Sequence, residues 1–127
     1  MKKALAVLLT GTVIISMGTS SVWAEGPDKS KTIVVYTNSG SEGRDEWLTK
    51  RAAEDGFNVQ VVNLGGSAVT ERMIAEKNNP LCDVVFGLNN IEYEKLKAED
   101  LLQKWEPEWL EGVDESLADK DGYYYPV

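Results

Sequence analysis

Residues 57–87, FNVQVVNLGGSAVTERMIAEKNNPLCDVVFG, decide the predicted fold of this chain. Two short runs rich in β-branched residues, 57–63 and 81–86, enclose a stretch in which apolar residues recur at helical spacing. Strands joined by a helical crossover pair in parallel, and such crossovers are right-handed. This stretch therefore predicts a strand–helix–strand unit of a parallel sheet, with its helix over residues 68–77.

The same pattern extends to both sides of this unit. Residues 32–36 predict a buried strand, and residues 42–54 predict a helix whose first turn is acidic. A third helical stretch begins near residue 90. The residues expected to face the core from the first and third helices are Trp47, Leu48, Ala52, Ile91, Leu96 and Leu101. The predicted fold class is α/β, an open and mostly parallel sheet with flanking helices.

The first 24 residues have the features of a cleavable signal peptide. Lys2 and Lys3 precede an uncharged apolar run over residues 4–17, and a small residue, Ala24, stands at the expected cleavage site. No cysteine lies near that site, so a lipoprotein is not expected. We predict that residues 25–31 form a flexible leader. We also predict that the mature protein is periplasmic or secreted, without membrane insertion.

Composition excludes several classes of function. The chain has 21 acidic and 13 basic residues, a net charge of −8, which disfavours nucleic-acid binding. It contains no histidine, so serine–histidine and cysteine–histidine nucleophiles and histidine zinc sites are excluded within it. Its one cysteine, Cys82, cannot form an intrachain disulfide, and its apolar surroundings predict a buried, inert thiol. We expect no cofactor and no enzymatic activity.

Three loops rich in glycine and small polar residues follow the predicted strands. They comprise residues 37–41, 63–67 and 87–90. Ligands of open parallel sheets collect at the carboxyl ends of the strands, where helix N-termini favour anions. The alternative is structural, because Ser41 and Ser67 can be ordinary helix N-caps. The sequence leaves these two readings equally supported.

Other motifs carry less information. Neither a dinucleotide fingerprint nor a phosphate loop is present. Trp105 and Trp109 are expected to pack at an edge of the core rather than to stack on a sugar. Most carboxylates, including Glu92 and Glu94, are expected to lie on solvated faces.

The loops and their flanking strands also resemble a known family. Residues 32–41, 63–67 and above all 77–87 (KNNPLCDVVFG) are similar to the solute-binding proteins of bacterial ABC importers, family 1, the ferric-iron and phosphonate type. Residues 112–126 resemble the stretch where such proteins cross from their first lobe to their second.

This resemblance implies two α/β lobes that close around one ligand and deliver it to an ABC permease with its ATPase. Family members are longer, so residues 32–122 are expected to form the first lobe, and residues 123–127 the start of a hinge strand to a missing second lobe. The tyrosines in this hinge are not expected to match the family's iron-binding tyrosines. The ligand-binding residues implied by position are Thr37, Asn38, Ser39, Gly66, Ser67, Gly87 and Leu88.

The first loop departs from the pattern of ferric binders, which resemble one another in carrying a histidine and an acid there. Asn38-Ser39-Gly40 stands in its place, so we favour a small oxyanion-bearing ligand such as a phosphonate over ferric iron in complex with an anion. Two rival hypotheses stay open. One is a secreted hydrolase that uses Ser39 or Ser67, and the other is a non-functional truncated fragment.

Overall fold

The computed structural model describes residues 29–114 and 116–126, so the predicted signal peptide and most of the predicted leader lie outside the described residues. In chain order the elements are β1 (Thr32–Thr37), α1 (Arg44–Glu54), β2 (Asn58–Asn63), α2 (Gly66–Ala75), β3 (Val84–Phe86), α3 (Asn90–Ala98) and a 3₁₀ turn, η1 (Glu108–Leu110).

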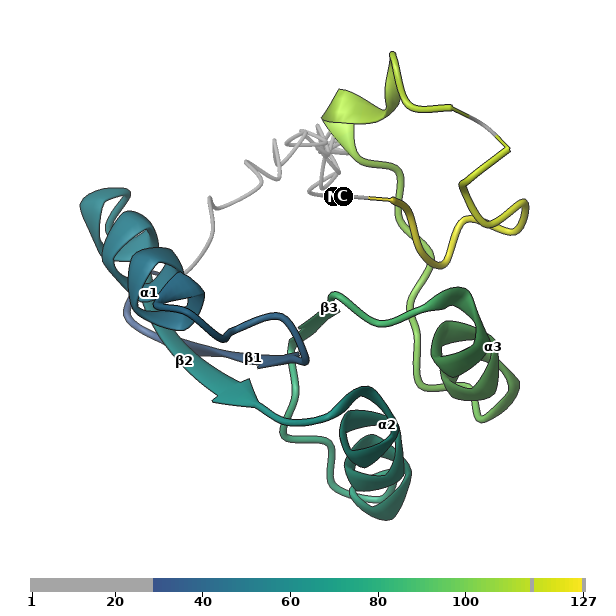
Figure 1. Ribbon diagram of the computed structural model, residues 1–127, viewed down its shortest axis with the longest axis horizontal. Helices are drawn as coiled ribbons and strands as arrows, with labels where there is room; N and C mark the ends of the chain where they lie inside the picture. The colour runs from purple at the N-terminus through teal and green to yellow at the C-terminus, as the bar shows by residue number, and fades with distance from the viewer. Residues whose placement is uncertain (1–28, 115, 127) are drawn as a thin grey trace, which may run out of the picture.

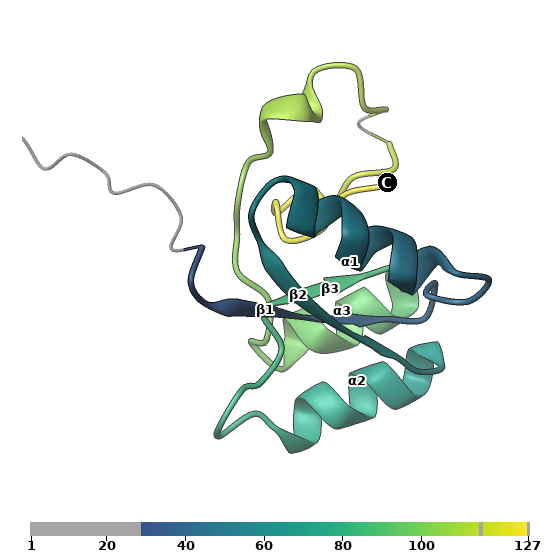
Figure 2. The same cartoon turned by 90° about the vertical axis from the view of Figure 1, so that its left-hand side faces the viewer.

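The three strands form one parallel sheet in the order β2-β1-β3. β1 pairs with β2 along its whole length, and its last three residues pair with β3. α1 covers one face of the sheet, whereas α2 and α3 cover the other (Figure 1). The turned view of Figure 2 also places α1 and α2 on opposite sides of the strands. The predicted fold class is confirmed.

The hydrophobic core lies between the sheet and the pair α2 and α3. Its buried members are Tyr36, Val69, Met73, Leu88 and Leu96. Tyr36 is fully buried, and its hydroxyl donates to the Glu76 carboxylate over 2.9 Å. The Arg72 guanidinium lies 4.6 Å from the centroid of the same ring, so α2 is fixed to β1 by polar as well as apolar contacts.

The prediction that Trp47 and Ile91 face the core is wrong, because each residue is 65 % exposed. α1 contacts the sheet over β2, at its edge, so only a narrow stripe of the helix is covered. α3 packs against α2 with its fully buried Leu96, and Ile91 lies outside that contact. Helical spacing identified amphipathic segments, but it did not set the width of the covered face.

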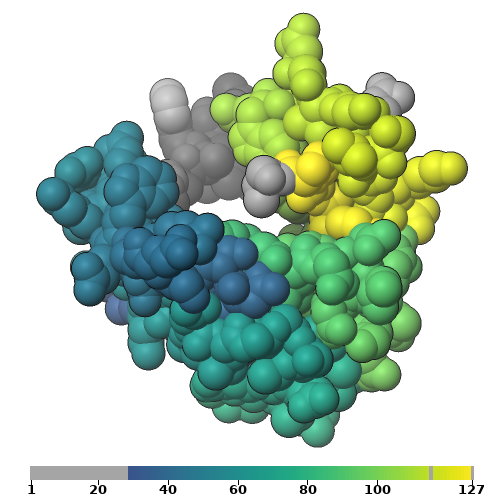
Figure 3. Space-filling model, in the orientation of Figure 1, coloured from purple at the N-terminus to yellow at the C-terminus, as the bar shows by residue number. Residues whose placement is uncertain are grey.

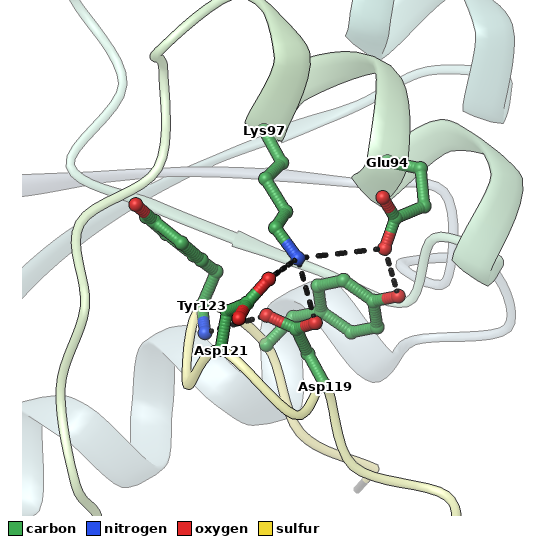
Figure 4. Close-up of polar contacts among 6 residues, drawn as sticks. Glu94, Lys97, Asp119, Asp121 and Tyr123 are labelled. Atoms are coloured by element: carbon green, nitrogen blue, oxygen red, sulfur yellow. Dashed lines mark hydrogen bonds and ion pairs between the residues drawn. The ribbon is translucent and has the colours of Figure 1, made fainter.

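Ionic contacts anchor the C-terminal segment, residues 116–126, to α3. The ammonium of Lys97 lies 2.8 Å from an Asp119 carboxylate oxygen and 2.7 Å from one of Asp121 (Figure 4). The hydroxyl of Tyr124 donates to Glu94 over 2.7 Å. These hydrogen bonds raise the pKa of Lys97 and raise that of Tyr124 to about 12. The segment is therefore held to α3 without forming a strand or a helix.

Aromatic side chains pack beside β3, whose outer edge pairs with no strand among the described residues. Trp105, Trp109 and Tyr125 meet edge to face, with ring centroids 6.0 to 6.2 Å apart. With Val84 and Val85 they line a cavity of about 250 Å³. The two tryptophans thus pack at an edge of the sheet, where the sequence placed them.

Two further predictions concern Cys82 and the hinge. Cys82 is a free thiol, half-buried rather than fully buried, and burial raises its pKa. Residues 123–126 form no strand, and their assignment as the start of a hinge stays a prediction. In the space-filling view the C-terminal segment and the first loop stand on either side of a hollow (Figure 3).

Candidate functional site

The three predicted loops lie at one edge of the sheet. Thr37, the last residue of β1, pairs with Asn63 of β2 and with Phe86 of β3, so the strands end in register. From β1 the chain passes to β2 on one side of it, and from β2 it crosses back over β1 to β3 on the other side. The direction of the strand order therefore reverses between β1 and β3. Ligands of open α/β sheets bind at such a switch point.

Asn38 and Ser39 in the first loop lie between the second and third loops. A Cβ built on Gly87 would lie 2.9 Å from Asn38 Oδ1 and 2.9 Å from Ser39 Cβ. One built on Gly66 would lie 3.3 Å from Asn38 Nδ2. Gly87, which also has a φ of +82°, is therefore needed for this close approach, whereas a Cβ at Gly66 would require only a small shift of the Asn38 amide. The structure brings these four predicted residues together.

The other three predicted residues lie at the margins of this cluster. Thr37 is fully buried, and its hydroxyl accepts the Ser39 N–H over 2.9 Å, so it shapes the first loop. Leu88 is a core residue, and its side-chain Cδ2 would lie 3.8 Å from a Cβ built on Gly66. Ser67 is exposed in the first turn of α2. Ligand binding by these residues stays a prediction.

The N-terminus of α2 is uncapped. Its N-cap residue is Gly65, and no side-chain capping hydrogen bond is formed at this end of the helix. The N–H groups of residues 66–68 therefore lack intrahelical acceptors, and the helix dipole favours an anion beside them. By contrast, Asn89 caps α3 by accepting the Glu92 N–H over 3.0 Å. The structure does not support Ser41 or Ser67 as N-caps, since extended or left-handed glycines hold the N-cap positions of α1 and α2.

Asn63 shapes the site, although the sequence placed it only in the second loop and not among the ligand-binding residues. In the orientation that satisfies its amide, Asn63 donates to the Thr37 carbonyl and accepts the Ser41 N–H, both over 3.3 Å. It therefore ties the first loop to the end of β2. The signal was an asparagine that ends a β-branched run, a residue type suited to such backbone contacts.

Glu92 was also missed, and the expectation that it lies on a solvated face is wrong. The residue is 8 % exposed, and its side chain lies in the contact between α2 and α3. The Thr70 hydroxyl and then the Lys95 ammonium lower its pKa. A sequence signal existed, because Asn89 followed by Glu92 three residues later has the spacing of a capping box.

The parallel sheet and its flanking helices define a fold class, the open α/β fold of the type II periplasmic-binding-protein kind. The chain is 35 % identical over 101 residues to a probable ABC transporter periplasmic-binding protein, y4fP, of Sinorhizobium fredii (strain NBRC 101917 / NGR234). That match covers 80 % of this chain and 28 % of the relative. The predicted resemblance to the solute-binding proteins of ABC transporters is thereby confirmed.

The fold is similar to that in the crystal structure of iron-bound HitA from Pseudomonas aeruginosa. The TM-score is 0.63 and the identity 22 %, over 72 % of this chain and 30 % of that one. The chain thus spans less than a third of the length of either protein. No protein-family model matches it.

Within residues 29–114 and 116–126, no helix has the length and apolar character needed to cross a membrane. No group of three or more histidine, cysteine, aspartate or glutamate side chains is arranged there to hold a metal ion.

Proposed function

We propose that this chain is a ligand-binding lobe of the solute-binding component of an ABC importer. It is exported by its signal peptide, captures a small ligand outside the cytoplasmic membrane, and works with a permease and its ATPase. The sequence similarity to a periplasmic-binding protein supports this role. Closure of a second lobe over the ligand would signal the bound state to the permease.

The favoured ligand is a small oxyanion, with phosphonates first and ferric iron in complex with an anion second. One observation carries this preference: the uncapped N-terminus of α2 meets Asn38 at the switch point of the sheet. Backbone N–H groups of residues 66–68, the Ser67 hydroxyl and the Asn38 amide supply neutral donors there. Neutral donors at a helix N-terminus suit an oxyanion.

An amide-resolved NMR titration with methylphosphonate tests this site. We expect millimolar affinity, because one lobe leaves half of the ligand in water, and shifts centred on the N–H groups of residues 66–68. Ser67→Ala should weaken binding about three- to tenfold, the value of one lost hydrogen bond. Ser116→Ala, in the distant C-terminal segment, should leave the affinity unchanged.

The same titration separates the candidate ligands. Shifts with a ferric–citrate complex but none with methylphosphonate or phosphate would reverse the order of preference. Shifts confined to lysine-rich surface away from these loops, or no shifts with any of the three, would contradict the proposed site. Hydrolysis of ester substrates by the chain, lost in Ser39→Ala, would favour the hydrolase hypothesis instead.

A further inference from the structure

Glu92 is a buried carboxylate with an unsatisfied oxygen. The residue is 8 % exposed, and its Oε2 accepts no hydrogen bond of good geometry among the residues that the structure describes, although the neighbouring Thr70 hydroxyl favours the charged carboxylate. Its Oε1 lies 3.0 Å from the Lys95 ammonium, which is itself about half exposed. A buried polar atom without a partner is costly, so it calls for an explanation beyond packing.

The position of Glu92 relates it to the proposed anion site. It is the third residue of α3 and neighbours Thr70 of α2, whose hydroxyl donates to the Gly66 carbonyl over 3.2 Å. Thr70 is one helical turn beyond Gly66, so the carboxylate lies roughly 6 to 8 Å behind the first N–H groups of α2. A negative charge is thus fixed directly behind donors that favour anions.

No basic residue of the loops offsets this charge. Residues 38–43, 64–67 and 87–89 contain neither lysine nor arginine, and their one charged residue is Glu42. An anion at the N-terminus of α2 is therefore held by neutral donors and repelled by Glu92. Because that repulsion grows with the charge of the ligand, it acts more strongly on dianions than on monoanions.

We infer that Glu92 is a specificity-determining residue of this site, which selects singly charged oxyanions over doubly charged ones. The inference rests on the proposed function, since it concerns the same site. The favoured ligands are protonated phosphonates, monoesters, and oxyanions whose second charge a bound cation neutralises. Glu92 contacts Thr70 rather than the ligand, so it acts through its field.

Replacing Glu92 by glutamine removes the charge and keeps the shape. A charge about 7 Å away is partly neutralised by Lys95, so we expect Glu92→Gln to tighten nitrate binding about fivefold and sulfate binding about twenty-fivefold. The second factor is the square of the first because sulfate carries twice the charge. Each anion is compared with itself in the two proteins, so ligand shape does not enter.

Glu71→Gln is the matched control. Glu71 is also on α2, one residue beyond Thr70, but it is exposed to water. Its removal changes the net charge equally at a similar distance from the helix N-terminus. Because water screens exposed charges, we expect less than a twofold change for either anion. Lys95→Gln, at an exposed site, should have the opposite sign to Glu92→Gln and weaken sulfate more than nitrate.

The measurement is the NMR titration of the full chain with nitrate and with sulfate at constant ionic strength. It is read at the N–H groups of residues 66–68, with circular dichroism confirming that each variant folds. Equal changes for the two anions, or no change in Glu92→Gln and Lys95→Gln, would refute charge selection while leaving the binding site in place. An absence of shifts at these groups in every protein would overturn this inference and the proposed site together.

Discussion

Gly87 is expected to be the glycine whose replacement costs most stability. A side chain at this position meets two independent penalties. The φ of +82° is a left-handed conformation that costs a residue with a Cβ about 1 to 2 kcal/mol. That Cβ would also lie 2.9 Å from both Asn38 Oδ1 and Ser39 Cβ, an overlap worth about 1 to 3 kcal/mol. Gly87→Ala should therefore destabilise the chain by about 3 kcal/mol.

Two other glycines separate these penalties. Gly112 has a φ of +107° with nothing within 4 Å of a built Cβ, so Gly112→Ala pays the backbone cost alone, about 1 to 2 kcal/mol. Gly65 is extended, with a φ of −61°, and its Cβ also meets nothing within 4 Å. Gly65→Ala should change the free energy of unfolding by less than about 1 kcal/mol.

The assay is urea unfolding followed by circular dichroism, with thermal melts in parallel. A domain of this size has only about 5 to 10 kcal/mol of stability, so Gly87→Ala should lower the melting temperature by roughly 15 °C. The expected order of loss is Gly87, Gly112, Gly65. If Gly87→Ala were no more destabilising than Gly112→Ala, the packing of Asn38 and Ser39 against Gly87 would be refuted.

Three further predictions follow from the core and the C-terminal anchor. Leu96→Ala should cost about 2 to 5 kcal/mol in urea unfolding, since this side chain is fully buried; a loss below about 1 kcal/mol would contradict the described core. Lys97→Met should speed amide hydrogen exchange across residues 119–125 while α2 stays protected, because Lys97 bonds to Asp119; unchanged exchange there would contradict the anchor. The Tyr124 pKa of about 12 exceeds its unfolded value near 10. The stabilisation of the fold by the hydrogen bond between Tyr124 and Glu94 should therefore be complete below pH 10 and lost between pH 10 and 12. Ultraviolet titration should show a lower Tyr124 pKa in Glu94→Gln than in the native chain.

The sequence was sufficient to predict the parallel sheet but not the limits of its strands. Residues 81–86 were expected to form the third strand, whereas β3 begins at Val84. Asp83 explains the difference, because its carboxylate accepts the Val34 N–H over 2.8 Å in place of a strand carbonyl. Gly66 and Ser67 likewise join α2 because the extended Gly65 serves as its N-cap. Each limit depends on a contact between segments far apart in the sequence or on one glycine's φ and ψ.

The candidate site could likewise be predicted from the sequence only in part. Parallel strands that end in register bring their following loops together, so Asn38, Gly66 and Gly87 could be grouped from the order of elements alone. The burial of Glu92 could not, because it arises from the packing of α3 on α2. A capping pattern indicates where a helix begins, but it does not identify the neighbouring element that packs against the first turn.

The close packing of Asn38 and Ser39 against Gly87 couples the stability of the fold to the proposed binding site. A ligand that bonds to Asn38 stabilises the native chain by RT ln(1 + [L]/Kd), which is about 2.7 kcal/mol when the ligand concentration exceeds Kd a hundredfold. Gly87→Ala should lose both the packing and this ligand-dependent gain, because the added Cβ displaces Asn38. Gly112→Ala should destabilise the chain yet keep the full ligand-dependent stabilisation. The difference between the two variants therefore distinguishes a site built by these loops from an anion effect on the chain as a whole.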